Sequence, residues 1–358
     1  MIPVHYPPVG IAHITSHPLD LIARRITSNV TSIDFACVSQ PKSTPHLGTA
    51  VLMFVSFALA AEASRKYGVR SRVLLDILEN SPGREWTEDG NSYFLPLDRV
   101  ADGGTNVADS AGSALREIGT DLANRSGVEF ASRFYTEIQS QRSFRAGLDR
   151  MIRSHDQFSA VLAPTTGRLL VRPLCPDCGT GNKNASDVTW NLDSKVAGAT
   201  AYCPSHGPYS FSLIDEQEVI DCNTPVRSVL RSFSFLESDR VHRRLTVVVN
   251  GADWSGEWMQ HVYLSGLDLL GVSVRNTPPN LFSPLILDES GAKLSKTIYL
   301  REGAYDHLAP AWRSYSAFVE HYGERGLDAL WGEVQTWARD PARFFRNYSL
   351  SYLESVVR

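Results

Sequence analysis

The chain has 358 residues and a formal net charge of −4, with 43% hydrophobic and 21% charged residues. This length predicts two or three packed units, and the composition is that of a folded protein. The net charge lacks the basic signature of a dedicated nucleic-acid binder, although it is compatible with a local basic face. Five cysteines are too few for a disulfide scaffold, and the N-terminus does not begin with a basic-then-apolar leader. We therefore expect the reducing cytoplasm as the compartment.

The first part of the chain predicts a strand, a helix and a second strand. SIDFACVSQ (32–40) is typical of a buried strand, and an apolar helix is expected over 49–67, closed by Gly68. VRSRVLLDILEN (69–80) predicts the next strand. This order predicts a parallel sheet with a right-handed crossover. The apolar run AVLMFVSFALAA (50–61) is too short to cross a bilayer, so we interpret it as a buried helix.

The rest of the chain predicts helices, a polar insertion and a return to α/β alternation. Helical patterns occupy 110–125 and 129–155, and RRLTVVVNGADW (243–254) is typical of another buried strand. A helix is expected after that strand, and the chain is expected to be helical after Thr297. The predicted fold is α/β, with a Rossmann-type parallel sheet. Its expected parts are 1–83, the first half of the sheet domain; 84–167, a mostly helical connection; 168–235, a zinc-binding insertion; 236–300, the second half; and 301–358, a C-terminal helical segment.

Two short cysteine motifs predict a metal site. LCPDCGTG (174–181) and YCPSHGPY (202–209) share the form Cys-Pro-x-(Cys or His)-Gly, in which Pro and Gly fix a tight turn. The four ligands would be Cys175, Cys178, Cys203 and His206. Three thiolates and one imidazole, with no open position, are typical of structural Zn²⁺. Coincidence and a redox Cys-x-x-Cys are the alternatives, but a redox pair needs no second knuckle.

The loop after the first strand carries Pro45-His46-Leu47-Gly48-Thr49 at the start of the apolar helix. Backbone N–H groups and the helix dipole favour an anion at this place in a βαβ unit. His46 can donate to a phosphate oxygen, and Gly48 lets a flat adenine or ribose approach the backbone. A cap or a surface residue is the alternative role for such a histidine.

A second candidate phosphate site is the stretch GAKLSKTIY (291–299). The chain has only six lysines, and two of them, Lys293 and Lys296, stand in this turn. Lysine is a compact charge on a flexible stem, suited to following a phosphate that moves during a reaction. A solvated turn is the alternative.

Together these motifs resemble the signature of class I aminoacyl-tRNA synthetases, which reads His-Ile-Gly-His and Lys-Met-Ser-Lys-Ser. The first motif departs from it at Thr49, which can donate one hydrogen bond but cannot carry a histidine's positive charge. Asn250-Gly251-Ala252-Asp253-Trp254 is similar to the Gly-x-Asp segment of the family, whereas the alternative is an ordinary turn after a strand. Within the class the chain looks most like class I lysyl-tRNA synthetase, and the resemblance covers most of residues 30–300.

The resemblance implies roles for individual residues. His46, Lys293 and Lys296 would be catalytic and would contact the phosphates of ATP, which brings Mg²⁺ with it. A second group would bind the nucleotide: Gly48, Thr49, Gly251, Asp253, Ser295 and Thr297. The implied amino-acid pocket suits lysine. The segment after Thr297 is long enough for a short stem-contact region but not for a helical anticodon-binding domain.

The expected activity is ATP-dependent amino-acid activation to an aminoacyl-adenylate, followed by aminoacyl transfer to a small amine or hydroxyl acceptor. One alternative is a truncated synthetase that acts on tRNA through its acceptor stem. Another is a non-catalytic relative that binds an amino acid or RNA, against which the two lysines argue. Neither a membrane nor DNA is expected as a partner, and the sequence predicts no oligomeric state.

Overall fold

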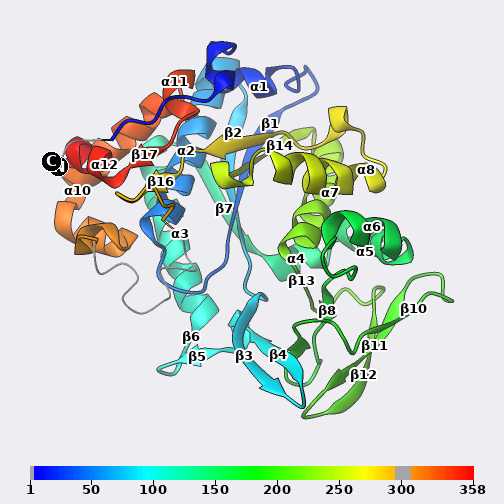
Figure 1. Cartoon of the computed structure of the whole chain (residues 1–358). Coiled ribbons are helices and arrows are strands. Elements are labelled where there is room, and N and C mark those ends of the chain that lie inside the picture. Colours follow the sequence, from blue (N-terminus) through cyan, green and yellow to red (C-terminus); the bar gives the residue numbers. More distant parts are fainter. Residues whose placement is uncertain (1–3, 295–307) are drawn as a thin grey trace.

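A five-stranded parallel sheet forms the centre of the molecule in a computed structural model that describes residues 4–294 and 308–358 (Figure 1). Its strand order is β15-β14-β1-β2-β7. Numbered in chain order, this is 5-4-1-2-3, the order of a doubly wound Rossmann sheet. The predicted Rossmann-type sheet is therefore confirmed. Its strands are β1 (Ser32–Ser39), β2 (Arg70–Ile77), β7 (Glu129–Phe134), β14 (Arg244–Gly251) and β15 (Asn280–Ser283).

Strand β1 is the central strand, and its side chains alternate between two covered faces. Phe35 pairs with Val73 on β2 and with Val247 on β14, and all three are fully buried. Phe35 belongs to the cluster that includes α2 (Leu47–Tyr67), whereas Ala36 packs with Phe235 of α7 (Thr224–His242). A strand covered on both faces has a nearly continuous apolar sequence, which explains why this strand could be predicted.

One face of the sheet is covered by α2, with α3 (Val107–Ser126) and α10 (Tyr315–Trp337) packed against it (Figure 1). Among the described residues, α2 is the one helix long and apolar enough to cross a membrane, but 72% of its most apolar window is buried. The interpretation as a buried helix is therefore confirmed. Gly68 ends α2 in the left-handed conformation, with φ of 64°.

The region expected to be a mostly helical connection contains several strands. The expectation of a helix from residue 129 is wrong, since Glu129–Phe134 forms the edge strand β7 and the helices begin after it. Strand β4 pairs with β3 and with β9, and β5 pairs with β6. The elements here are β3 (Pro82–Glu88), β4 (Asn91–Pro96), β5 (Ala101–Asp102), β6 (Thr105–Asn106), α4 (Tyr135–Gln139), α5 (Arg142–Arg153) and α6 (His155–Leu162).

The cysteine-containing insertion consists of short strands with little helix, as Figure 1 shows below the central sheet. Strand β11 pairs with β10 and β12, and β13 pairs with β8. The strands are β8 (Val171–Pro173), β9 (Gly181–Asn182), β10 (Thr189–Asn191), β11 (Gly198–Cys203), β12 (Gly207–Ser212) and β13 (Ile220–Cys222).

The last part of the chain returns to the sheet and then becomes mostly helical. A π-helical turn, Trp258–Leu264, precedes α8 (Ser265–Leu269), and β16 (Ile286–Leu287) pairs with β17 (Tyr348–Ser349). Helices α11 (Pro341–Phe344) and α12 (Leu350–Val357) follow α10. The helical expectation for this segment is confirmed over the described residues, apart from β17. At the N-terminal end, η1 (Gly10–His13) and α1 (Asp20–Ala23) form short turns, and the backbone N–H of Val9 donates to the carbonyl of Phe345 at 2.7 Å.

Candidate active site

A cavity of about 410 Å³ opens at the carboxyl ends of β1 and β14. We call it the switch-point cavity, because these neighbouring strands are where the order of a doubly wound sheet reverses. Ligands of such sheets bind in this crevice. Its wall includes Ser39 from the end of β1, Gly251 from the end of β14 and Ser283 from the end of β15.

The first turn of α2 supplies one side of the switch-point cavity. His46 is the N-cap residue, and its ring nitrogen Nε2 lies 3.1 Å from the hydroxyl of Thr49. His46, Gly48 and Thr49 all line the cavity. A Cβ at Gly48 would lie 3.0 Å from Cε1 of His46, so glycine here leaves room for the imidazole. The positive end of the helix dipole faces the same space, which favours a bound anion.

The turn after β14 supplies a carboxylate on the opposite side. Asp253 lies in a single 3₁₀ turn, Ala252–Trp254, and both Asp253 and Gly251 line the cavity. A Cβ at Gly251 would lie only 2.5 Å from Oδ1 of Asp253, so any larger residue would displace that carboxylate. The two residues of the Gly-x-Asp segment therefore depend on each other.

Lys293 closes the third side. Its backbone forms a bridge with Leu287, and the next N–H, that of Leu294, donates to the carbonyl of Ile286 at 3.0 Å. The Nζ of Lys293 lies 2.5 Å from Oδ2 of Asp253. Both side chains are partly exposed, so this pair can exchange partners at little free-energy cost when an anion enters.

The remaining residues of the lysine motif, Ser295, Lys296 and Thr297, lie outside the described residues. The other six residues predicted to be catalytic or to bind the nucleotide all line the switch-point cavity. They are His46, Gly48, Thr49, Gly251, Asp253 and Lys293. Two segments more than 200 positions apart in the sequence therefore meet at one cavity, as the motif order predicted.

A second cavity of about 240 Å³ adjoins the first, and the two share the wall formed by Val38, Ser39, Gln40 and Trp254. We call it the arginine cavity, because Arg227 and Arg231 of α7 line it. Five residues spaced three or four apart turn one face of α7 toward it: Thr224, Arg227, Ser228, Arg231 and Ser232. Sequence reasoning missed this cavity. Its signal was the polar stripe on α7, opposite the buried Val226, Val229 and Leu230.

The two arginines share their carboxylate partners with two further arginines. Asp76, at the end of β2, is contacted by Nε of Arg231 and by Nε of Arg133, the latter at 2.6 Å. Asp221 is shared in the same way, since its oxygens lie 2.6 Å from Nη2 of Arg227 and 2.5 Å from Nη2 of Arg172. Asp76 and Asp221 are fully buried.

Aromatic side chains close the arginine cavity. Trp254 and Trp258 meet edge to face, with ring centroids 4.6 Å apart, and both line the cavity. The hydroxyl of Tyr263 donates to Oγ of Ser232 at 2.9 Å. An apolar wall with a few oriented polar groups is typical of a small-molecule site.

The four predicted metal ligands converge. The ligand atoms of Cys175, Cys178, Cys203 and His206 all lie within 4.8 Å of one another. The Sγ atoms of Cys178 and Cys203 are 3.5 Å apart, and Nδ1 of His206 lies 3.6 Å from Sγ of Cys175 and of Cys203. A tetrahedron with bonds of ~2.3 Å has edges of ~3.8 Å, so the spacing and the donor set fit a metal ion.

Cys178 ionises more readily than Cys203, whose pKa burial raises to about 11. Burial alone raises the pKa of Cys178, but hydrogen bonding with Thr180 and with the neighbouring cysteines outweighs burial and lowers the pKa to about 7. The thiolate is the form that binds metal, so this environment favours a bound cation.

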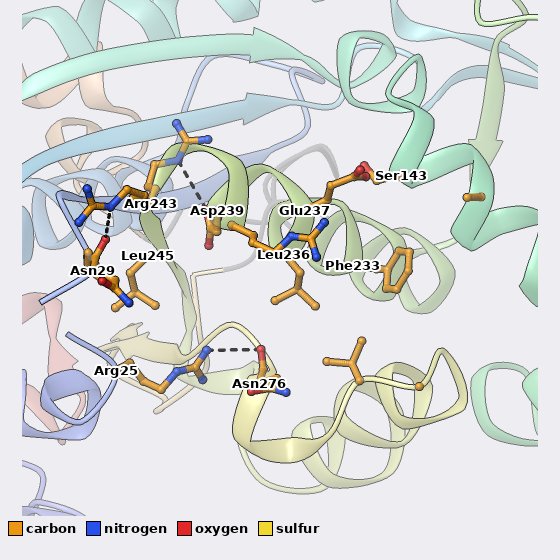
Figure 2. Close-up of a pocket in the computed structure, with 16 residues that line it drawn as sticks. Arg25, Asn29, Ser143, Phe233, Leu236, Glu237, Asp239, Arg243, Leu245 and Asn276 are labelled. Atoms are coloured by element: carbon orange, nitrogen blue, oxygen red, sulfur yellow. Dashed lines mark hydrogen bonds and ion pairs between the residues drawn. The ribbon is translucent and has the colours of Figure 1, made fainter. Parts of the chain in front are cut away.

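A larger cavity, of about 980 Å³, lies at the opposite, amino-terminal edge of the sheet and contains none of the predicted site residues. Figure 2 shows two of its arginines, Arg25 and Arg243, bonded to neighbouring backbone carbonyls. Arg25 donates to Asn276 at 3.4 Å, and Arg243 donates to Asn29 at 3.1 Å. Arg244 contacts Asp34 and Asp239, whereas Arg240 is exposed to solvent.

No protein-family model matches the chain, and no curated protein matches it. Among solved structures, one from Campylobacter jejuni assigned as an arginyl-tRNA synthetase is similar over 94% of this chain and 70% of its own, with a TM-score of 0.40 and 10% identity. Methionyl-tRNA synthetase of Mycobacterium tuberculosis, solved with methionyl-adenylate, is similar over 91% and 68%, with a TM-score of 0.45 and 12% identity. The function of this chain is therefore argued from its own fold, a doubly wound parallel sheet with two joined cavities at its carboxyl edge.

Proposed function

We propose that the chain activates an amino acid with ATP, forming an aminoacyl-adenylate and pyrophosphate. The observation that carries this proposal is that His46, Asp253 and Lys293 surround one cavity at the switch point of the sheet. The cavity adjoins a second one of suitable size for an amino acid. A cavity of about 240 Å³ exceeds several-fold the ~30 Å³ that one water occupies in the liquid.

In the proposed reaction a carboxylate oxygen of the amino acid attacks the α-phosphorus of ATP. The bond from that phosphorus to the bridging oxygen breaks, and pyrophosphate leaves with the electron pair. Negative charge builds on the α-phosphoryl oxygens and on the leaving group, so catalysis consists of positioning and electrostatic stabilisation. No proton transfer is needed in this step.

Each side chain has a distinct part in this proposal. His46 and the first turn of α2 hold the α- and β-phosphates, and Asp253 accepts from a ribose hydroxyl. Lys293 leaves Asp253 to contact the β- and γ-phosphates, and Lys296 joins it there. Mg²⁺ arrives with ATP as part of the substrate and adds positive charge at the phosphates.

Exchange of labelled pyrophosphate into ATP tests this proposal. The full chain, supplied with Zn²⁺ and Mg²⁺, is expected to catalyse exchange only when one particular amino acid is present. Absence of exchange across all twenty standard amino acids would contradict the proposal. The same assay without amino acid serves as the control for contaminating activity.

For the metal site we propose structural Zn²⁺ held by the three cysteines and His206. The insertion that contains them has little apolar core of its own, so bound metal would contribute to its folding. Metal analysis should find one zinc per chain, and Cys203→Ser should lose it together with the fold of the insertion. Retention of a folded insertion without bound metal would refute this role.

For the second step we propose transfer of the aminoacyl group to a small amine or hydroxyl acceptor, with tRNA as the alternative. The net charge of −4 supports the first, since a tRNA interface needs a basic surface. Ribonuclease treatment of the assay distinguishes them. Product that persists after treatment supports the small acceptor, whereas its loss supports tRNA.

A further inference from the structure

We propose that the arginine cavity binds the side-chain carboxylate of an acidic amino acid, so that the activated substrate is glutamate, aspartate or a close analogue. This inference rests on the proposed adenylation and names its substrate class. The observation behind it is an excess of buried positive charge in the cavity next to the proposed ATP site.

The charges around the cavity do not balance. Asp76 is shared by Arg133 and Arg231, and Asp221 is shared by Arg172 and Arg227. Each carboxylate offsets one of its two guanidinium groups, which leaves one positive charge in each set. Arg227 and Arg231 are 5% and 4% exposed, so water screens this excess poorly.

No carboxylate among the described residues that line the cavity supplies the missing negative charge. The nearby Glu79 is engaged elsewhere, since it accepts from the backbone N–H groups of Tyr135 and Thr136 at 2.7 and 2.9 Å. Burial raises the pKa of Glu79 and thereby disfavours its charged form. An anionic ligand would complete the balance, and a buried cation gains most from such a partner.

The two guanidinium groups are held in place before any ligand arrives. Arg227 lies over the ring of Tyr135 at 5.4 Å from the centroid, and Arg231 lies over the ring of Phe235 at 5.0 Å. Stacking and ion pairing together restrict rotation of these long side chains. A ligand carboxylate therefore meets donors that are already oriented, which lowers the entropy cost of binding.

The position of the arginine cavity indicates where each of the two carboxylates of such a substrate would lie. The α-carboxylate must reach the α-phosphate of ATP in the switch-point cavity. The side chain then extends past the shared wall of Ser39, Gln40 and Trp254 toward Arg227 and Arg231. A substrate with one carboxylate would leave the excess positive charge of this cavity without a ligand anion to offset it.

A lysine substrate, which the resemblance to class I lysyl-tRNA synthetase implies, does not suit this cavity. Its ammonium group would approach two guanidinium groups with no lining carboxylate to receive it. Like charges at this range in a poorly screened site repel each other. The pocket chemistry therefore differs from the one that the sequence motifs imply.

Pyrophosphate exchange over a panel of glutamate, aspartate, glutamine, asparagine and lysine tests the inference. We expect an acidic member to exceed its amide by about 10²-fold or more in kcat/KM, because the amide leaves charged donors unpaired. If lysine or an uncharged amino acid is the best substrate, this inference is overturned and the adenylation proposal stands.

Direct binding separates the two proposals if no exchange is seen. Equilibrium dialysis with labelled glutamate and aspartate, with and without ATP, measures their affinity for the protein without requiring catalysis. Binding of an acidic amino acid in preference to its amide supports the inference even where adenylation fails. Absence of such preference in both assays overturns it.

A matched pair of variants links the preference to the cavity. Arg227→Gln and Arg172→Gln each remove one of the two guanidinium groups on Asp221, but only Arg227 lines the cavity. We expect Arg227→Gln to raise the KM for the acidic amino acid about ten- to a hundredfold, with the KM for ATP unchanged. Arg172→Gln should change it less than about threefold. Equal effects would overturn the inference.

A third variant keeps the test decisive if removal of a buried arginine impairs folding. Ser228→Asp adds a carboxylate to the arginine-bearing face of α7 and removes no ion pair. The new carboxylate should occupy the guanidinium groups, raise the KM for the acidic substrate about tenfold or more, and preserve the fold. An unchanged KM in a folded Ser228→Asp protein would count against the cavity as the binding site.

Discussion

The arginines at the two edges of the central sheet differ in how far they are exposed to solvent. At the amino edge, Asp34 contacts Arg72 at 2.8 Å and Arg244 at 3.2 Å, and Asp239 contacts Arg244 at 3.5 Å. The other arginines that line the cavity at this edge, Arg25, Arg240 and Arg243, are partly or fully exposed. At the carboxyl edge, four guanidinium groups share Asp76 and Asp221. The cavity at the amino edge is larger, so it is buried, poorly screened positive charge rather than volume that marks the candidate site.

The largest effect should come from removing one of the shared carboxylates. Asp76→Asn leaves the buried Arg231 and the half-buried Arg133 without a negative partner, and breaking a buried pair in this way costs about 3–5 kcal/mol. Asp34→Asn should cost less, because Arg244 keeps Asp239 and Arg72 is partly exposed. Urea unfolding of both variants gives the two free energies. Equal losses would show that the edges do not differ.

The next effect concerns catalysis rather than stability. Lys293→Ala should reduce the rate of pyrophosphate exchange by a factor on the order of 10², since it removes one charge that stabilises the leaving phosphates. Its side chain is 40% exposed, so the fold should be preserved. Arg240→Ala is the matched control, because Arg240 is an exposed cation at the amino-edge cavity. A similar loss in both variants would argue against a distinct site at the carboxyl edge.

A smaller effect is expected from Glu62, on the part of α2 farthest from the switch-point cavity. Burial alone would raise its pKa, but hydrogen bonds from Arg65, His17 and Arg339 outweigh burial and lower the pKa to about 2. The folded state therefore binds this proton less readily than the unfolded chain does. The stabilisation is present above about pH 4.5 and is lost as the pH falls toward 2.

Glu62→Gln should accordingly flatten the dependence of stability on pH between about 4.5 and 2 and leave exchange at neutral pH unchanged. Thermal unfolding across that pH range measures the first, and the exchange assay measures the second. A loss of activity without a change in the pH profile would mean that α2 couples the two edges.

The sequence predicted the elements that depend on residues within one short segment of the chain. The runs that became β1, β2 and β14 are buried over most of their length and are therefore rich in apolar residues, and the glycine after α2 stands where a left-handed residue is needed. The convergence of Cys175, Cys178, Cys203 and His206 could be predicted because two short turns fix their spacing. Strand β7 could not, because EFASRF is a partly exposed edge strand whose pattern also fits a helix.

The arginine cavity was beyond sequence reasoning for a different reason. Arg227 and Arg231 are two among many arginines of the chain, and exposed helix faces carry the same residue four positions apart. Their significance depends on Asp76 and Asp221, which reach them from other elements. Net charge in a cavity is a property of the folded chain. The motifs at His46 and Lys293, by contrast, are ordered along the sequence and met as expected.

A crystal structure of the full chain with ATP and Mg²⁺ would test the central claim most directly. The account predicts the triphosphate at the carboxyl edge of the sheet, between the first turn of α2 and Lys293, with the ribose next to Asp253. Nucleotide bound in the larger cavity at the amino edge, or none bound at saturating ATP, would contradict it.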